Sequence, residues 1–246
     1  MGIYIGTSGW SYEDWVEKFY PEGIEKSEWL KYLTEHFNSV ELNMSFYRYP
    51  FKNMLKGWRK RMPDDFQMTM KANRRITHYN KFKNIGAALE KFYSLFDLIY
   101  ENKGCILFQA PPSFKKNEQN KARIENFCNL TNKKYKNVIE FRDPEWWDDE
   151  IFNLLEEHKV GFCTVSGLEM PSRVVVTGEI AYFRFHGPAE PYSSLYSAEE
   201  MQTWAEKIRQ VRSKYDVNDI YCYFNNDTNA YAITNARQLQ DYLDFE

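Results

Sequence analysis

Short apolar runs alternate with longer segments of helical periodicity along the whole 246-residue chain. The runs have the length and the aliphatic and aromatic content that are typical of buried strands. Between most of them, apolar residues recur at the spacing of an amphipathic helix. The predicted strands are residues 3–7, 39–44, 67–71, 105–109, 137–142, 161–165, 181–186 and 220–225. The predicted helices are residues 27–37 (with Ser27 as N-cap), 53–61, 85–101, 118–132, 149–158, 198–214 and 232–243.

This order of elements predicts a single (β/α)8 TIM-type barrel. Strand and helix alternate with a mean repeat of about 31 residues, as expected for eight units in a chain of this length. The sixth unit is irregular, because residues 171–179 favour a loop and a short extra strand over a helix. No linker or composition shift divides the chain, which predicts one domain, 1–246. A doubly wound open sheet is the alternative, but no glycine-rich phosphate loop follows the first strand.

Polar residues fall on one parity of the predicted strands and come late in each. Successive side chains of a strand point to opposite faces, and in a barrel one of these faces is the interior. Catalytic groups of TIM barrels gather at the carboxyl ends of the strands. The predicted interior cluster is Glu41, Asn43, Lys71, Gln109, Glu140, Arg142, Arg184, His186 and Asn225. The alternative is a buried ion-pair network that only holds the barrel, although unpaired buried charge is costly.

Composition narrows the classes of function. A net charge of −3 argues against a dedicated nucleic-acid binder, which usually has a basic excess. The four cysteines include no CxxC pair, and no apolar run approaches the roughly 18 residues of a membrane span. These features predict a soluble, reduced, cytoplasmic protein. Of the four histidines, His36 and His158 fall in predicted helices, so a zinc site is disfavoured and no cofactor is expected. One divalent ion held by carboxylates remains an alternative.

Several motifs together resemble a known family. They begin with the opening segment 5–12 and include Val40-Glu41-Leu42-Asn43, Gln109 with Pro111-Pro112, Glu140-Phe141-Arg142, Arg184-Phe185-His186-Gly187 and Tyr223-Phe224-Asn225-Asn226. This combination resembles the YecE-like proteins, the family of domains of unknown function numbered seventy-two, over essentially the whole chain. The resemblance implies a TIM-type barrel and supplies no reaction.

The cluster offers four candidate catalytic groups. Glu140 and Glu41 are candidate general acid and base, because cationic neighbours and burial can separate the pKa values of two carboxylates. Lys71 would form a Schiff base if its pKa were depressed. His186 is a candidate proton shuttle. For the carboxylates and His186 the alternative is a structural role as ion-pair or hydrogen-bond partners.

The candidate binding residues point to an anionic ligand. Arginine forks match phosphate and carboxylate, and the loops after strands seven and eight (186–188 and 225–227) are where barrels often hold phosphate. Arg74 and Arg75 are expected at the rim. An aromatic mouth of Trp10, Tyr12, Trp15, Phe46, Tyr47, Trp146 and Trp147 is expected to stack on sugars or bases. The predicted substrate-binding residues are Arg142, Arg184, Asn43, Gln109, Asn225, Asn226, Tyr223, His78, Trp10 and Tyr47.

The sequence therefore predicts a metal-independent acid–base enzyme acting on a small anionic or polyhydroxylated substrate, such as a phosphosugar or nucleotide. A nucleic-acid binding or processing protein is the first alternative, with mouth arginines reading phosphates and aromatics stacking on bases. A glycoside hydrolase using Glu41 and Glu140 is the second. The pattern does not indicate an oligomeric state.

Overall fold

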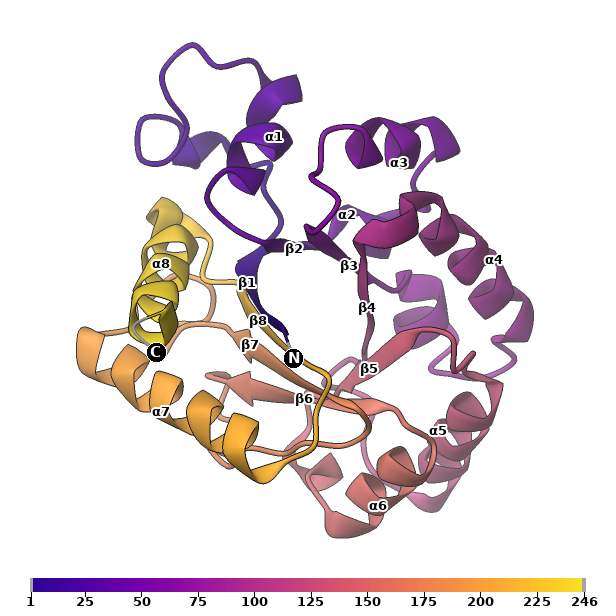
Figure 1. Ribbon diagram of the computed structural model, residues 1–246. Helices are drawn as coiled ribbons and strands as arrows, with labels where there is room; N and C mark the ends of the chain where they lie inside the picture. The colour runs from indigo at the N-terminus through magenta and orange to yellow at the C-terminus, as the bar shows by residue number, and fades with distance from the viewer. Residues whose placement is uncertain (1, 245–246) are drawn as a thin grey trace.

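Parallel strands hydrogen-bond to one another in chain order and close into a barrel in the computed structural model, which describes residues 2–244 (Figure 1). The eight strands are β1 Gly2–Ser8, β2 Ser39–Leu42, β3 Gln67–Lys71, β4 Lys103–Gln109, β5 Lys136–Glu140, β6 Gly161–Ser166, β7 Ile180–Phe185 and β8 Asp219–Phe224. This closure confirms the predicted TIM-type barrel. The predicted domain, 1–246, also includes residues 1, 245 and 246, which lie outside the described part of the chain.

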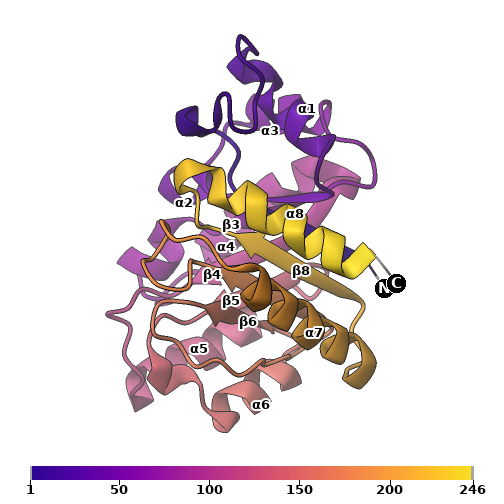
Figure 2. The same cartoon turned by 90° about the vertical axis from the view of Figure 1, so that its left-hand side faces the viewer.

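Helices surround this barrel and follow every strand except β6 (Figure 1). Their bounds are α1 Trp29–Thr34, α2 Met44–Tyr47, α3 Lys52–Arg59, α4 Gly86–Phe96, α5 Glu118–Leu130, α6 Asp149–Glu157, α7 Ala198–Lys214 and α8 Tyr231–Asp244. Figure 2 shows α7 and α8 side by side along the barrel. Within residues 2–244 no helix combines the length and apolarity needed to cross a membrane.

The helix starts are set by local capping chemistry. The predicted helix 198–214 coincides with α7, because Ser197 and Glu200 form a reciprocal capping box at its start. Ser27 was expected to cap the first helix, and this is wrong. It lies inside the 3-10 turn η2 (Lys26–Glu28), and α1 begins only at Trp29. The predicted helix 85–101 ends early, at Phe96, and a 3-10 segment, η4 (Asp97–Asn102), follows it.

The second strand is shorter than predicted, and this shapes the mouth of the barrel. β2 ends at Leu42, so Asn43 leaves the strand and precedes α2. The Ser45 hydroxyl donates to the carbonyl of Lys71 at 2.7 Å, which ties α2 to the end of β3. The residues of α2, Phe46 and Tyr47 among them, consequently stand at the carboxyl ends of the strands.

The sixth unit has no helix, as predicted, but the short extra strand that was also predicted does not form. Residues 167–179 run from β6 to β7 as a loop whose only regular pairing is an isolated bridge between Thr177 and Ile180. Thr164 of β6 fixes this loop, because its hydroxyl both donates to the carbonyl and accepts from the N–H of Val175, each at 3.0 Å. The side-chain bonds thus replace the packing that a covering helix would supply.

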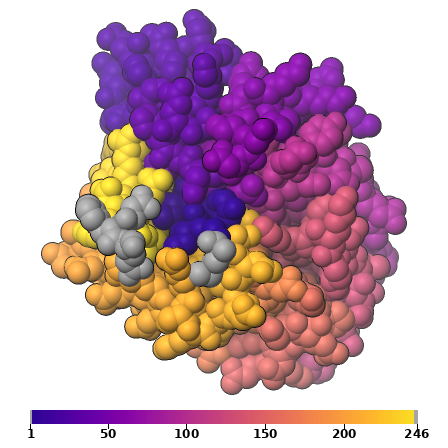
Figure 3. Space-filling view, in the orientation of Figure 1, coloured from indigo at the N-terminus to yellow at the C-terminus, as the bar shows by residue number. Residues whose placement is uncertain are grey.

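The barrel interior is layered. β1 begins at the face shown in Figure 3, where indigo atoms lie at the centre. Next to these amino-terminal ends, tyrosine rings fill the interior. Tyr4 is stacked on Tyr221 with ring centroids 4.9 Å apart, and Tyr182 packs against Tyr223. The charged residues come next, at the carboxyl ends of the strands. The prediction that alternate residues of each strand face the interior is confirmed. Leu107, Val138 and these tyrosines share the parity of the polar residues on their strands, and they pack together in one interior cluster.

Candidate active site

A cavity of about 420 Å³ opens at the carboxyl ends of the strands. Its volume lies in the range of small-molecule sites, and its position is where TIM barrels hold their active sites. Seven predicted site residues line it: Asn43, Tyr47, Lys71, Gln109, Arg142, Arg184 and Asn225. Four further residues complete the lining: Tyr12, Phe46, Tyr192 and Asp227. We call this space the mouth cavity.

Arg184 of β7 is the centre of the polar cluster beneath the mouth cavity. Its Nε and Nη2 donate to the two oxygens of Glu41 at 3.0 and 2.7 Å, and its Nη1 donates to Glu140 at 2.7 Å. Further contacts join Nη2 to Ser8 at 3.2 Å and Nη1 to His186 at 3.4 Å. A guanidinium has five N–H donors, so these contacts use its capacity. Arg184 is 1% exposed and is a structural clamp between two carboxylates.

The carboxylate of Glu41 has no free site for a substrate. Besides Arg184, it accepts from the hydroxyls of Ser8 at 2.7 Å and Tyr182 at 2.6 Å. Four donors fill the lone-pair sites of a carboxylate. The sequence analysis missed Ser8 and Tyr182, although Tyr182 shares the interior parity of Arg184 on β7 and could have been found by it.

Glu140 is held ionised by its neighbours. Burial alone would raise its pKa, but Arg142 and Arg184 outweigh burial and hold the pKa of Glu140 well below its ordinary value. Arg142 donates from Nε to the oxygen that Arg184 leaves free. A carboxyl with so low a pKa cannot act as a general acid near neutral pH. Since both glutamates are fully buried and neither lines the mouth cavity, their predicted acid–base roles do not fit the geometry.

His186 is part of the same structural network. Its Nε2 lies 3.2 Å from Nη2 of Arg142 and its Nδ1 lies 3.3 Å from Nδ2 of Asn225. Both neighbours can only donate, so the neutral ring accepts a hydrogen bond at one of these two nitrogens. Burial and the two arginines lower the pKa of His186 to about 3. The imidazole is therefore neutral at neutral pH and enclosed by Arg142, Arg184 and Asn225, surroundings that favour a structural role over the predicted proton shuttle.

Arg142 differs from Arg184 in keeping free donors. It donates from Nε to Glu140, from Nη1 to the Tyr192 hydroxyl at 3.1 Å, and from Nη2 to His186. Of the five N–H groups of a guanidinium, one on each terminal nitrogen remains. Two terminal N–H groups of one guanidinium are the donors that bind a carboxylate or phosphate in bidentate fashion.

Lys71, the last residue of β3, presents an amine without a counter-ion. Burial, followed by repulsion from Arg184, lowers the pKa of Lys71 to about 7. The nitrogen lies 4.5 Å from the ring centroid of Phe46. Within residues 2–244 it makes no ion pair, because the buried carboxylates of Glu41 and Glu140 are taken by arginines.

Asp227 is a site residue that the sequence analysis missed as a titrating group. It lies in the loop after β8, beyond the reach of the parity test, and it lines the mouth cavity beside Tyr12. Burial raises the pKa of Asp227 to about 7, and its buried Oδ1 has no hydrogen-bond partner. Counting Asp227, three carboxylates balance Lys71, Arg142 and Arg184, so the predicted excess of cations at the mouth is absent.

Comparison with known proteins places the chain in a family. Residues 4–246 match the family described as "Protein of unknown function DUF72". The chain belongs to this family. Among curated proteins, it is 25% identical over 280 residues to the UPF0759 protein YunF of Bacillus subtilis, covering 99% of this chain and 95% of YunF. The UPF0759 protein YecE of Escherichia coli is 26% identical over 145 residues, or 59% of this chain and 50% of YecE.

Solved structures of DUF72 proteins have the same fold. A DUF72 family protein from Thermotoga maritima is 32% identical, with a TM-score of 0.89 and coverage of 99% of this chain and 100% of that one. One from Enterococcus faecalis has a TM-score of 0.84 at 20% identity, over 99% and 96% of the two chains, which is a likeness of fold alone. These findings confirm the resemblance to YecE-like proteins. Because the family description gives no reaction, the function of this DUF72 chain has to be inferred from the mouth cavity.

Four predicted binding residues of the DUF72 chain lie outside the mouth cavity. The Tyr223 hydroxyl is a layer below, 2.5 Å from Ser39 and 2.9 Å from Thr69. The Asn226 amide donates to Ser194 and Asn235. His78 packs behind Phe46, and Trp10 lines a neighbouring cavity with Trp58. These four are therefore not part of the mouth-cavity lining, and their predicted contact with a substrate stays a prediction.

The predicted phosphate loops are also occupied. The N–H of Gly187 donates to the Tyr196 hydroxyl at 3.1 Å, and the N–H of Asn225 donates to the Phe185 carbonyl at 2.8 Å. A phosphate site needs backbone N–H groups that are free to point at the anion. The N–H groups of Gly187 and Asn225 are therefore not available to an anion.

Much of the predicted aromatic mouth is core. Trp15 and Trp146 are fully buried, and the Trp146 indole N–H donates to the Phe114 carbonyl at 2.7 Å. Trp147 packs edge-on against Phe162. Only Tyr12, Phe46 and Tyr47 of the predicted set line the mouth cavity. Aromatic residues in long loops therefore mostly serve to close the barrel end.

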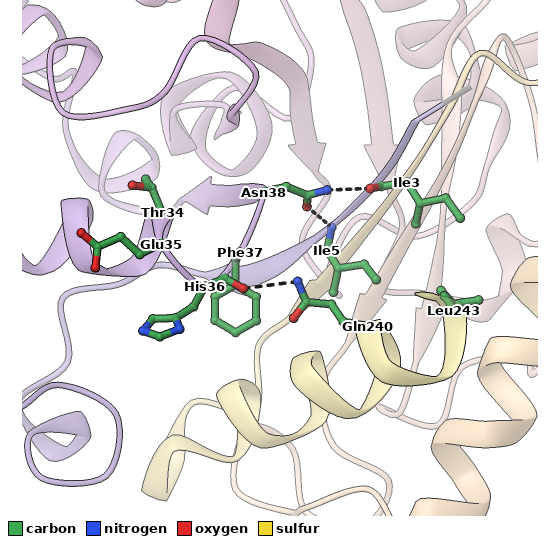
Figure 4. Close-up of a pocket in the computed structure, with 9 residues that line it drawn as sticks. All are labelled: Ile3, Ile5, Thr34, Glu35, His36, Phe37, Asn38, Gln240 and Leu243. Carbon is green, nitrogen blue, oxygen red and sulfur yellow. Dashed lines mark hydrogen bonds between the residues drawn. The ribbon is translucent and has the colours of Figure 1, made fainter. Parts of the chain in front are cut away.

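A second cavity, of about 290 Å³, lies at the opposite end of the barrel (Figure 4). Its polar groups bond to one another. The Asn38 side chain accepts from the N–H of Ile5 and donates to the carbonyl of Ile3, each at 2.8 Å, and Gln240 donates to His36. Since β1 pairs with β2 only from Gly6 onward, Asn38 continues the missing ladder. This end of a TIM barrel usually serves stability.

Metal ligands do not gather in the described part of this DUF72 chain. Residues 2–244 contain no group of three or more His, Cys, Asp or Glu side chains that could hold an ion. The four cysteines are buried and free, and burial raises the pKa of Cys128 to about 12. Such thiols are protonated at neutral pH.

Proposed function

We propose that this DUF72 protein is an enzyme that binds a small anionic, polyhydroxylated molecule, such as a phosphosugar or nucleotide, and moves protons on it. The observation that supports this most is that Lys71 and Asp227 line one cavity and both have a pKa of about 7. Groups of this kind exchange protons most effectively near neutral pH. Perturbed titratable groups in a cleft are typical of active sites.

Arg142 is the proposed anchor for the anionic end of the substrate. Its two free N–H groups suit one carboxylate or phosphate. Its side chain is only 8% exposed, and contacts with Glu140, Tyr192 and His186 already fix the guanidinium. An anchor that is ordered before binding loses little conformational entropy when the ligand arrives. The Gln109 amide, at the end of β4, adds a neutral donor in the same lining.

Unpaired acceptors support the polyhydroxylated part of the proposal. Asn43 Oδ1 and Asp227 Oδ1 are buried oxygens without a hydrogen-bond partner in the structure. Both residues line the mouth cavity. A buried acceptor left unpaired costs about 1–3 kcal/mol, and a substrate hydroxyl would remove this cost after a small side-chain rotation had turned the oxygen into the cavity.

The donor set suits chemistry without a metal ion. A divalent ion in a barrel mouth usually takes oxygens from more than one carboxylate, but Glu41 and Glu140 are bound by arginines, and the carboxylate that lines the mouth cavity is that of Asp227. Lys71 and Arg142 supply the positive charge at that place instead. The same geometry removes the basis for a glycoside hydrolase, because neither glutamate can reach a glycosidic bond.

The test is a thermal-shift screen of the purified protein with inorganic phosphate, sugar phosphates, nucleotides and short single-stranded oligonucleotides. A ligand at about 100 times its Kd adds about 2.7 kcal/mol to the free energy of unfolding, which corresponds to about 5–10 °C in Tm for a chain of this size. We expect such a shift with a small phosphorylated compound in the wild type. Arg142→Ala should abolish it, because the bidentate donors are lost.

Arg173→Ala is the matched control for this screen. Arg173 is an exposed arginine paired with Asp149, outside the mouth cavity, so its variant should keep the full shift. An equal shift in the Arg142→Ala protein would show that the anion binds elsewhere. The absence of a shift with every small anion would remove the proposed substrate class.

A nucleic-acid binder is the second candidate, and one observation favours it. Arg74 lies over the rings of Tyr47 and Tyr79, which are 63% and 66% exposed beside the mouth cavity. Exposed aromatic rings next to an arginine can stack on bases. In the same screen, shifts with oligonucleotides alone that fade steeply with added salt would favour this candidate over the first.

A further inference from the structure

We propose that the amino group of Lys71 forms an imine with a carbonyl carbon of the substrate, which makes the substrate class a small anionic aldehyde or ketone. This inference rests on the proposed function, because it needs the anion anchor and the proton-transfer group of the mouth cavity. It goes further by naming the reacting bond. Neither the family description nor the described relatives of this chain name a nucleophile.

The backbone fixes where the Lys71 side chain starts. Lys71 pairs with Leu107 of β4, and its carbonyl accepts from the Ser45 hydroxyl at 2.7 Å. Its side chain lines the mouth cavity, and the amine rests 4.5 Å from the Phe46 ring centroid. The amine is thereby held at the wall of a cavity, on an apolar support, at the end of a barrel strand.

The surroundings leave this amine without a partner. The carboxylates of Glu41 and Glu140 are close enough to act on its pKa, but Arg184 and Arg142 bind both of them. A structural lysine in a barrel interior would be expected to pair with one of these carboxylates. The network does the reverse, because it neutralises the glutamates with arginines and places the amine beside those arginines.

This arrangement favours the uncharged amine, which is the nucleophilic form. With a pKa of about 7, about half of the Lys71 amines are uncharged at pH 7. An ordinary exposed lysine, with a pKa of about 10.4, has an uncharged fraction about a thousand times smaller. Lysines that are desolvated beside another cationic group are known to be activated for Schiff-base chemistry.

The step balances without an external oxidant or reductant. The nitrogen lone pair adds to the carbonyl carbon, and the π electrons of the C=O bond move to oxygen, which takes a proton from a cavity acid such as Asp227. The nitrogen loses a proton, giving a carbinolamine. The hydroxyl then takes a proton and leaves as water while the nitrogen lone pair forms the C=N bond, which gives an iminium ion. The iminium nitrogen returns its remaining proton to the cavity carboxylate, which leaves the imine. The net change is amine plus carbonyl to imine plus water.

The anion anchor determines which carbonyl compounds fit. Arg142 would hold a carboxylate or phosphate by its two free N–H groups, while the carbonyl group lies toward β3 and Lys71. Asp227 follows β8, which is separated from β3 in the barrel by β1 and β2. We therefore expect the bound substrate to span the cavity between the Lys71 amine and the Asp227 carboxyl.

Trapping of the imine with a hydride donor tests the proposal directly. The wild-type protein is incubated at pH 7 with pyruvate, dihydroxyacetone phosphate or pyridoxal 5′-phosphate and sodium cyanoborohydride, which reduces imines to stable secondary amines. Peptide mass spectrometry then locates the modified lysines. We expect the initial rate at Lys71 to exceed the rate at any exposed lysine by about a hundred-fold or more, given its larger uncharged fraction. Excess inorganic phosphate should slow labelling at Lys71 alone.

Two variants serve as controls. Lys71→Met removes the nucleophile and should leave only the slow labelling of the exposed lysines. Lys159→Met removes an exposed lysine that pairs with Glu179, and it should leave the labelling of Lys71 unchanged. Because the wild-type protein alone gives the decisive comparison, the test does not depend on the folding of either variant.

Labelling of Lys71 no faster than that of exposed lysines, with all three probes, overturns the inference. The phosphate thermal shift, measured on the same preparation, separates the two proposals. A shift that depends on Arg142 without labelling at Lys71 would leave the proposed function and remove the imine. The absence of both would remove the anion site as well.

Discussion

Replacing Arg184 with methionine is expected to lower the free energy of unfolding by about 3–5 kcal/mol, the usual cost of breaking a buried ion pair from one side. Arg184 donates to both oxygens of Glu41 and to Glu140, and all three side chains are almost completely buried. Methionine fills a similar volume but leaves one carboxylate without a cation and the other with Arg142 alone. The loss should appear as a lower midpoint in urea denaturation.

Arg173→Met provides the comparison for this measurement. Arg173 pairs with Asp149 at the surface, where an ion pair contributes about 0–1 kcal/mol. A loss for Arg184→Met no larger than that for Arg173→Met would mean that the clamp between Glu41 and Glu140 does not hold the barrel. The Arg184 variant should also regain stability at low pH relative to the wild type, because protonation removes the uncompensated carboxylate charge.

Asp227→Asn is expected to stabilise the protein at pH 8 by about 2–4 kcal/mol. The pKa of Asp227 rises from 3.8 to about 7 on folding because the carboxyl is buried. Between these two values the folded state binds more protons than the unfolded state, so the carboxyl costs stability as the pH rises, and the full cost is reached above pH 7. Asparagine has no such cost, and its gain should disappear as the pH falls to about 4.

Urea titrations of the wild type and the Asp227→Asn protein at pH 4, 6 and 8 measure this gain. Asp148→Asn is a control of opposite sign. Lys116 and the N–H groups at the start of α6 lower the pKa of Asp148, so its ionised form stabilises the fold. A gain for Asp227→Asn that is the same at every pH would contradict the shifted pKa. A residue that destabilises its own fold at working pH is typical of a functional site.

The cluster of polar residues in the barrel combines two of the interpretations that the sequence left open. Its lower part, Glu41, Glu140, Arg184 and His186, is the ion-pair network that holds the strands. Its upper part, Lys71 and Arg142 with Asp227, keeps unpaired groups in the mouth cavity. The network fixes Arg142 and excludes counter-ions from Lys71, so the structural part prepares the site above it.

The sequence by itself determined the barrel and the end at which the site lies. Strand periodicity and loop length are local properties. The two-residue repeat of a strand places alternate residues on one face, whichever strands lie beside it. Glu41, Lys71, Gln109 and Arg184 were therefore assigned to the interior before any contact was known. The absence of a helix after β6 could also be predicted from local sequence, because residues 167–179 lack helical periodicity.

Only the tertiary structure decided which polar side chains pair and which stay free. Arg184 meets Glu41 and Glu140 from strands that are distant in the sequence, and this pairing engages both of the predicted catalytic glutamates. Asp227 gained its raised pKa from burial by residues of other loops, and Trp146 became core for the same reason. Pairing and desolvation depend on distances between segments that are far apart in the sequence. These distances are set by the closed barrel, so the protonation states and free donors of the site follow from the tertiary structure alone.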